Sequence, residues 1–303
     1  MDILITGANG MLGGKCVELL SKKHNVIASD IGDNSVNPQP VTYKKVNIAD
    51  KKSVFKAVNE VRPDVVLNCG AYTDVDGAEI NRQNSWDVNV EGVKNIINAM
   101  VPFEGHLIQI STDYVFDGSE GPYKEEDDTS PINYYGETKL AAEEFITGSG
   151  AKHTIIRTNV LYGVSLSHAA CFVNWVIGKM KNREVIYVVN DQFGNPTWVV
   201  GLAEAISLII DKEATGVFHY GGLDYLNRFE FALQIAAIFA LDPRLIRQSS
   251  TRALGQRAKR PYKAGLYTDK ITKELGAKVY SIKESLEIMK GSIIEESGNN
   301  SNI

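Results

Sequence analysis

The first two-thirds of the chain alternate short apolar runs with longer stretches in which apolar residues recur every three or four positions. The short runs predict strands, and the longer spacing predicts helices that bury one face. This alternation is typical of a parallel, doubly wound sheet with helices on both faces. The expected strands span residues 3–5, 26–30, 41–46, 65–68, 106–112 and 153–157.

Helices are expected between these strands. The first has an apolar stripe that includes Cys16, Val17 and Leu20. A second begins after Asp50, whose carboxylate can accept a hydrogen bond from a free backbone N–H, and it ends before Pro63. The others are expected at 86–99, around Tyr135, and at 172–180, 202–210, 227–239 and 281–289.

The turn after the first strand is rich in glycine, with Gly7, Gly10 and Gly13 in the run Gly7-Ala-Asn-Gly-Met-Leu-Gly13. A glycine turn that joins a strand to a helix lets the backbone approach a pyrophosphate, and the helix N-terminus supplies unpaired N–H groups. An ordinary glycine turn in an α/β protein is the alternative. The strand before and the helix after favour a dinucleotide site.

Asp30 ends the second strand, twenty residues after Gly10. A carboxylate at this place can accept hydrogen bonds from the ribose hydroxyls of an adenosine and would repel a 2′-phosphate. NAD(P)H is therefore the expected cofactor, with NADH favoured by Asp30, although a solvated aspartate is the alternative. Asn47 and Ile48, after the third strand, are expected to flank the adenine.

Tyr135 and Lys139 stand one helical turn apart, downstream of a strand that ends in Thr112. The spacing alone also suits a surface tyrosine beside a solvated lysine. Behind a dinucleotide site, however, carbonyl reduction needs a proton donor at the oxygen. We expect Tyr135 to be that donor, Lys139 to lower its pKa and contact the nicotinamide ribose, and Thr112 to hold the substrate oxygen.

Beyond about residue 160 the regular alternation weakens. We therefore expect a Rossmann-like α/β fold with a smaller, interwoven C-terminal substrate domain. The dinucleotide-binding domain is expected at 1–160, with further elements from about 185–215. The substrate-binding portion is expected at 161–184 and 216–297, followed by a disordered polar tail at 298–303 that has nothing to bury.

Composition excludes several other classes. The net charge of the 303 residues is −5, and no block of lysine and arginine suggests nucleic-acid binding. No apolar run approaches the length of a membrane span. The three cysteines lie apart and are expected to be reduced core thiols, and the first residues already form a strand, so we expect a cytoplasmic protein. No serine-hydrolase elbow, P-loop or zinc-protease motif is present.

The chain resembles the dTDP-4-dehydrorhamnose reductase family of extended short-chain dehydrogenase/reductases. Six segments carry the resemblance: Gly7–Gly13, Arg62–Asp76, Ser111-Thr-Asp-Tyr-Val-Phe-Asp-Gly118, Tyr135-Gly-Glu-Thr-Lys-Leu140, Asp191–Thr197 and Arg260-Pro261. The family reduces the 4-keto group of a nucleotide-linked 6-deoxyhexose in deoxysugar biosynthesis. A nucleotide-sugar substrate is therefore expected.

The resemblance also implies roles for single residues. Thr112, Tyr135 and Lys139 match the catalytic set. Positions that contact the cofactor are matched by Gly10, Met11, Leu12, Asn47, Ile48, Gly70, Ala71 and Tyr72. Positions that contact the substrate are matched by Thr112 and Asp113. Arg260 is a candidate for the substrate phosphates, because a guanidinium can pair with them bidentately, and a structural salt bridge is the alternative.

The chain departs from the family in two places. Family members often have a tryptophan against the substrate where this chain has Val160, which changes the pocket and leaves the sugar open. Some bacterial members dimerise through a magnesium site built from glutamates. Those glutamates have no match here, so a homodimer is compatible with the resemblance but no metal is predicted.

Two other functions fit the same scaffold. A nucleotide-sugar 4-epimerase would retain NAD through its cycle. A non-catalytic regulatory subunit is also conceivable, since the β subunit of methionine adenosyltransferase is similar to this family. The complete set of Thr112, Tyr135 and Lys139 favours the reductase over the regulatory subunit.

Overall fold

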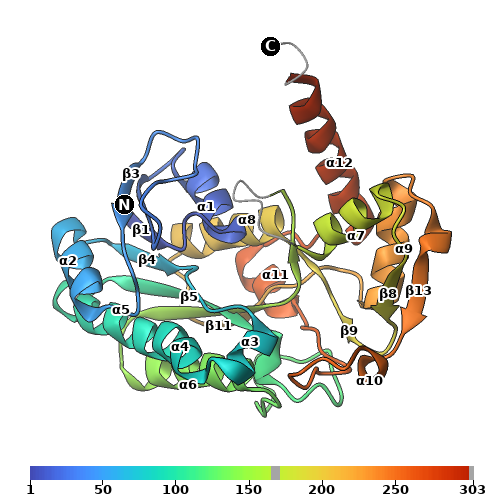
Figure 1. Ribbon diagram of the computed structural model, residues 1–303. Helices are drawn as coiled ribbons and strands as arrows, with labels where there is room; N and C mark the ends of the chain where they lie inside the picture. The colour runs from blue at the N-terminus through green and yellow to red at the C-terminus, as the bar shows by residue number, and fades with distance from the viewer. Residues whose placement is uncertain (165–170, 300–303) are drawn as a thin grey trace.

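A computed structural model describes residues 1–164 and 171–299 of the chain. Its centre is a parallel sheet of seven strands in the order β11-β6-β5-β4-β1-β2-β3 (Figure 1). The bounds are β1 (Asp2–Thr6), β2 (Asn25–Asp30), β3 (Thr42–Lys45), β4 (Val65–Asn68), β5 (His106–Thr112), β6 (His153–Thr158) and β11 (Gly216–His219). Six of these are the expected strands, each within one residue at either end, and the α/β fold class is confirmed.

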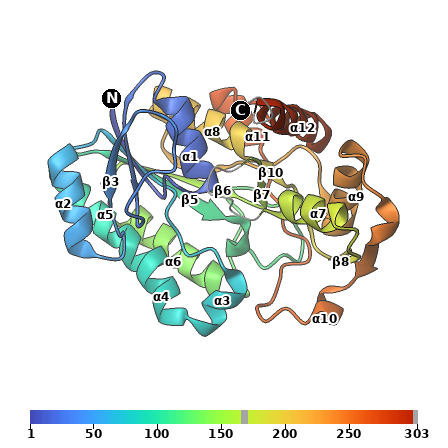
Figure 2. The same ribbon diagram turned by 45° about the horizontal axis from the view of Figure 1, so that its top comes forward.

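Helices cover both faces of this sheet (Figure 2). Strand residues alternate between the faces, so that Ile3 and Ile5 of β1 pack on one side and Leu4 on the other. One face carries α1 (Met11–Leu20), α8 (Val199–Asp211) and α11 (Asp269–Leu275). The opposite face carries α2 (Lys51–Val61), α5 (Gly92–Met100) and α6 (Tyr134–Gly148).

The ends of α2 are as predicted. The Asp50 carboxylate accepts a hydrogen bond from the Lys52 N–H at 2.9 Å and caps the helix. Arg62 adopts a left-handed backbone conformation, with φ of 48°, and Pro63 follows it. The helix therefore stops where the chain must turn into β4.

The helix expected at 86–99 begins earlier and contains a wider turn. It consists of α4 (Arg82–Trp86), a π-helical turn at Asp87–Glu91 and α5, and it follows the unpredicted α3 (Val75–Ile80). Inside the wide turn, the Asn89 side chain accepts from the Tyr72 N–H at 2.8 Å and donates to the Thr138 hydroxyl at 3.0 Å. The π turn thus ties the loop after β4 to α6, which an uninterrupted helical pattern does not reveal.

A smaller part of the molecule has its own core. It is built from α7 (Phe172–Lys181), α9 (Arg228–Ile238), α12 (Ile282–Asn299) and the parallel pair β8 (Ile186–Val189) and β13 (Ile246–Ser249). Shorter elements are β7 (Leu161–Tyr162), β9 (Phe193–Gly194), β10 (Thr197–Trp198), β12 (Leu226–Asn227) and α10 (Thr251–Leu254), with 3₁₀ turns at Val101–Phe103, Asp113–Val115 and Pro243–Leu245.

Two strands belong to a different part of the molecule from the part that the sequence predicts for them. Residues 216–219, expected in the substrate-binding portion, form β11 at the edge of the central sheet beside β6. This follows because the buried helix α8 runs against α1 and returns the chain to the sheet. Residues 186–189, expected with the dinucleotide-binding elements, pair instead with β13, where α9 covers them.

The last helix is longer than expected. Instead of ending at residue 289, α12 continues to Asn299, so residues 298 and 299 of the expected tail belong to the helix. The added stretch, residues 290–299, contains two glycines and two serines, which are poor helix formers, and for this reason the sequence does not predict the extension. The rest of that tail, 300–303, lies outside the described residues. In the described part of the chain, no helix has both the length and the apolar character that a membrane crossing requires.

Candidate active site

The glycine turn between β1 and α1 packs directly on the loop that leaves β4. Gly7 has φ of 66°, and a Cβ there would lie 2.6 Å from the backbone N of Gly70. A Cβ on Gly13 would lie 2.1 Å from the Gly7 carbonyl oxygen. Side chains at these two positions are excluded. Gly10 precedes the first residue of α1, so the turn presents that helix's N-terminus, and this cradle fits the pyrophosphate of a dinucleotide.

The residues next to this cradle are buried or partly buried in the cores of the protein. Met11 is partly buried between the two cores, and Leu12 is buried in the core of the central sheet. Ile48 is buried, and its Cδ1 would lie 3.2 Å from a Cβ on Gly70. The structure therefore brings the segments 47–48 and 70–72 to the same edge of the sheet as the glycine turn.

Asp30 lies beside the same turn. Its Oδ2 accepts a hydrogen bond from the Asn9 N–H at 2.9 Å, and its Oδ1 accepts one from the Ile31 N–H at 2.7 Å. The nearest lysine in register, Lys45 of β3, pairs with Asp33 at 2.7 Å. The carboxylate is thus held at the end of β2, and Lys45 pairs with Asp33 instead of Asp30.

Thr112 and Asp113 stand at the carboxyl end of β5. The Thr112 hydroxyl accepts from the Tyr114 N–H at 3.1 Å and donates to Asp113 Oδ1 at 3.2 Å. Asp113 is 2% exposed, and burial raises the pKa of its carboxyl to about 6. Arg228, Asn159 and Thr112 oppose this rise. Ligands of parallel sheets bind beyond this end of the strands.

Tyr135 is the second residue of α6, which begins after Asn133; the Asn133 side chain caps the helix by accepting from the Gly136 N–H at 2.8 Å. The Tyr135 ring meets Tyr114 edge to face, with 6.1 Å between ring centroids. Burial raises the Tyr135 pKa, the charge of Asp113 adds to the rise, and a hydrogen bond with Thr112 opposes it. Tyr135, Thr112 and Asp113 are therefore neighbours.

The predicted lowering of the Tyr135 pKa by Lys139 is wrong. Lys139 is 4% exposed, and its ammonium group donates a hydrogen bond to the Ile110 carbonyl oxygen at 2.7 Å. Burial lowers the Lys139 pKa to about 8, and Glu143, one turn further along α6, opposes this change. The lysine is anchored to β5, so burial and Asp113 dominate at Tyr135 and keep the phenol protonated.

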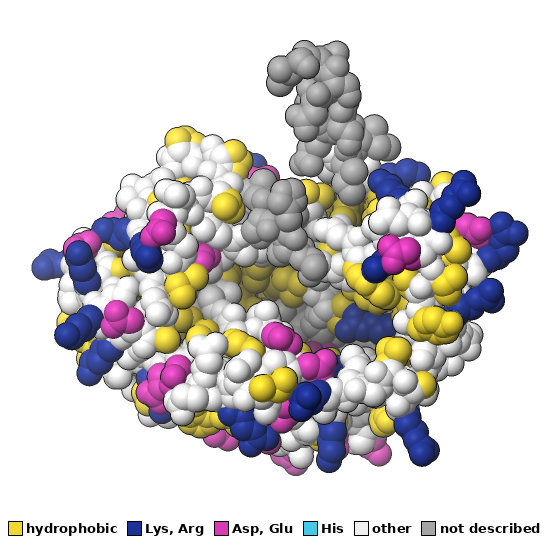
Figure 3. Space-filling model, in the orientation of Figure 1, with side chains coloured by type: hydrophobic (Ala, Val, Ile, Leu, Met, Phe, Trp, Pro, Cys, Tyr) yellow, Lys and Arg dark blue, Asp and Glu magenta, His cyan; other side chains and the backbone are white. Residues whose placement is uncertain are grey.

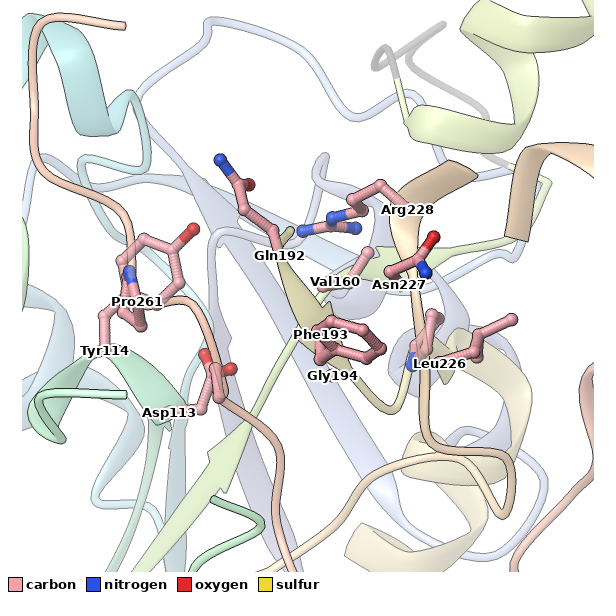
Figure 4. Close-up of a pocket in the computed structure, with 12 residues that line it drawn as sticks. Asp113, Tyr114, Val160, Gln192, Phe193, Gly194, Leu226, Asn227, Arg228 and Pro261 are labelled. Carbon is pink, nitrogen blue, oxygen red and sulfur yellow. The ribbon is translucent and has the colours of Figure 1, made fainter. Parts of the chain in front are cut away.

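A pocket opens beside Asp113 between the central sheet and the smaller part (Figure 4). In the space-filling view this face of the molecule is hollowed (Figure 3). The walls combine residues from the 3₁₀ turn after β5, the β6–β7 connection, β9, β12 and the start of α9. The lining residues are Asp113, Tyr114, Val160, Gln192, Phe193, Gly194, Pro196, Leu226, Asn227, Arg228, Pro261 and Ala264.

Of two other residues expected to contact the substrate, Val160 lines the pocket and Arg260 does not. Val160 lines the pocket and has φ of 37°, a left-handed conformation that strains a β-branched residue. Arg260 forms the structural salt bridge that was its alternative, with Nη2 2.9 Å from Asp76 Oδ2, and also donates to the Ala258 carbonyl oxygen. Its neighbour Pro261 lines the pocket instead.

Sequence reasoning missed Arg228, Gln192 and Asn227, which form one wall of the pocket (Figure 4). The apolar spacing of residues 227–239 predicts only a helix that buries one face. One signal was present: a positive charge in the first turn of a helix is disfavoured by the helix dipole, so an arginine there calls for another explanation.

The chain is similar to known proteins in sequence and in overall fold. Residues 1–292 match the family model described as RmlD substrate binding domain. The dTDP-4-dehydrorhamnose reductase of Aggregatibacter actinomycetemcomitans is 32% identical over 242 residues, 77% of either chain.

Solved structures are similar over nearly the whole chain. A dTDP-4-dehydrorhamnose reductase from Clostridium acetobutylicum has a TM-score of 0.88 and 33% identity, covering 97% of this chain and 100% of that one. The dTDP-4-dehydrorhamnose reductase of Bacillus anthracis, solved in complex with NADP, has a TM-score of 0.87 and 32% identity, covering 96% and 99%.

Proposed function

The chain belongs to the dTDP-4-dehydrorhamnose reductase family, and from this premise we propose that it reduces the 4-keto group of a nucleotide-linked 6-deoxyhexose. One observation carries the proposal. Thr112, Asp113 and Tyr135 meet at the carboxyl end of β5, on the same sheet edge as the glycine cradle of Gly7 and Gly13. A proton donor and a dinucleotide site on one edge are what carbonyl reduction requires.

The residues divide the chemistry between them. A nicotinamide coenzyme, when bound, supplies the hydride that reduces the carbonyl carbon. Tyr135 gives its phenolic proton to the carbonyl oxygen, and the alcohol results. Because burial and Asp113 raise the Tyr135 pKa, the phenol holds this proton at neutral pH until negative charge develops on the substrate oxygen. We propose that the Thr112 hydroxyl, which donates to Asp113 in the structure, turns to donate to the same oxygen when the substrate binds.

The coenzyme contacts follow from the cradle. We propose that Gly10, Met11 and Leu12 hold the pyrophosphate, that Asn47-Ile48 and Gly70-Ala71-Tyr72 flank the adenosine side, and that Lys139 contacts the nicotinamide ribose. Preference for NADH over NADPH rests on the Asp30 carboxylate beside Asn9 and on the pairing of Lys45 with Asp33. A homodimer and a cytoplasmic location stay predictions from the sequence.

The test is to follow the oxidation of NADH and of NADPH by the purified chain with a small panel of nucleotide 4-keto-6-deoxysugars. We expect consumption of coenzyme with at least one of these sugars, and faster turnover with NADH. Absence of turnover with every sugar would contradict the proposal. Tightly bound coenzyme without net consumption would favour a 4-epimerase, and co-purification of an inactive chain with a synthetase would favour a regulatory subunit.

A further inference from the structure

Arg228 brings a positive charge into the pocket from the smaller part of the molecule. It is the first residue of α9, and its backbone N–H donates to the Gln192 carbonyl oxygen at 3.2 Å. Its guanidinium group extends from the wall formed with Gln192 and Asn227 (Figure 4). Among the pocket residues named above, Arg228 is the one cation and Asp113 the one carboxylate.

The other arginines near the site already have carboxylate partners. Arg157 pairs with Glu143 at 2.7 Å, and Arg260 pairs with Asp76 at 2.9 Å. Within the described residues, Arg228 has no carboxylate at ion-pair distance, and its guanidinium lies over the Phe172 ring, 5.6 Å from the centroid. A structural salt bridge therefore does not account for Arg228.

The position of Arg228 is costly for a structural residue. The side chain is only partly exposed, and burial lowers its pKa, while Tyr114 and Asp113 favour the charged form. The N-terminal end of a helix also repels a cation. A charge held away from water without a full partner is stabilised by a bound group of opposite sign. The lining of the pocket thus suits an anionic ligand on this wall.

We propose that Arg228 binds the diphosphate of the nucleotide sugar, a role that rests on the proposed function for the identity of the ligand. A guanidinium presents parallel N–H donors that match two phosphate oxygens. The Asp113 carboxylate, next to Thr112, repels phosphate. The two charges therefore orient the substrate, with the uncharged sugar toward Asp113 and Tyr135 and the diphosphate toward Arg228.

The test is calorimetric binding of dTDP and UDP, with thymidine and uridine as the matching nucleosides, to the full chain. We expect Arg228→Gln to weaken binding of the preferred diphosphate about 10- to 100-fold while nucleoside affinity stays unchanged. Arg228→Lys keeps the charge but lacks the parallel N–H donors of a guanidinium. Its diphosphate affinity should lie between those of the wild type and Arg228→Gln. Arg247→Gln, at an exposed arginine of β13, is the matched control and should bind as the wild type does.

Several outcomes would overturn the proposal: wild-type chain that binds neither diphosphate, Arg228→Gln with wild-type diphosphate affinity, or equal losses for diphosphate and nucleoside. Circular dichroism of each variant identifies misfolding. If Arg228→Gln is misfolded, the diphosphate affinity of Arg228→Lys is compared with that of the wild type instead. Because binding is measured without turnover, an Arg228-dependent diphosphate site in a chain that reduces no keto sugar would contradict the proposed reaction and support this inference.

Discussion

Arg157 and Glu143 form a buried ion pair one helical turn from Lys139. The Arg157 Nε donates to both carboxylate oxygens, at 3.2 and 3.1 Å, and Nη2 donates to Oε2 at 2.7 Å. The Ser111 hydroxyl donates to the same carboxylate. Tyr135, Lys139 and Glu143 follow each other at four-residue spacing on α6, so the negative charge of Glu143 acts on Lys139, the residue proposed to contact the nicotinamide ribose.

Replacing this carboxylate should change both stability and pH dependence. Lys139 is proposed to contact the nicotinamide ribose as an ammonium group. This charged form is present below its pKa of about 8, so turnover of the wild type at limiting coenzyme should fall as pH rises through 8. Glu143→Gln removes a charge that raises this pKa, so the alkaline limb should move to lower pH. It also leaves Arg157 buried without its partner, which costs about 3–5 kcal/mol of unfolding free energy.

A pH–rate profile and a denaturant titration measure these two effects. The control is Glu144→Gln, at the exposed neighbouring position, which should change neither. An alkaline limb that stays in place in Glu143→Gln would show that the pair is structural only.

The cradle depends on a missing side chain at Gly7. Gly7→Ala should sharply weaken coenzyme binding and lower the melting temperature, because the added Cβ would meet the Gly70 backbone at 2.6 Å and φ is positive. Gly148→Ala, at the end of α6 with open space around it, is the control and should leave coenzyme binding unchanged. Coenzyme titration by fluorescence measures both. Normal affinity in Gly7→Ala would disprove the close approach.

The buried carboxylate of Asp113 should make the protein less stable at neutral pH than a neutral residue would. Its folded pKa of about 6 lies above the ordinary 3.8, so its favourable contribution is present below pH 3.8 and is lost as pH rises through 6. Asp113→Asn should therefore be more stable than the wild type at pH 7.5, by about 3 kcal/mol, with no gain near pH 3.8. Denaturant titrations at both pH values measure this, and a gain that does not depend on pH would contradict it.

How far the sequence predicts this molecule depends on how local each signal is. Buried parallel strands are continuous apolar runs, and the helix cap at Asp50 is set by its own neighbours, so these were predicted closely. The π turn around Asn89 was not, because its reason is a contact with Tyr72 and Thr138 across the fold. The partner of β8 also lies some sixty residues away in β13.

The candidate site shows the same division. Thr112, Tyr135 and Lys139 can be predicted as a set because the first ends a strand and the other two lie one helical turn apart, and this set stays a prediction. The direction of the Tyr135 pKa was predicted wrongly, because burial and the neighbour Asp113 are properties of the assembled pocket. Arg228 was missed for the same reason, since β9 and α9 place it there from far along the chain.

Backbone strain at Val160 gives an unusual order of stabilities. A Cβ in the left-handed region costs about 1 kcal/mol or more, so Val160→Gly should be more stable than Val160→Ala by about 1 kcal/mol. The same pair of changes at the half-buried Val200 of α8 should give the opposite order, because alanine favours a helix. Thermal unfolding of the four variants tests this. A higher melting temperature for Val160→Ala than for Val160→Gly would rule out the strain.

The proposed reaction depends most on the proton carried by Tyr135. The direct measurement is the turnover of Tyr135→Phe beside Tyr134→Phe, with coenzyme affinity determined for each. Loss of the proton donor should lower kcat about 10²- to 10⁴-fold in Tyr135→Phe and leave coenzyme affinity nearly unchanged. Tyr134→Phe, whose residue four positions on is Thr138, should keep its turnover. Wild-type turnover in Tyr135→Phe would contradict the mechanism.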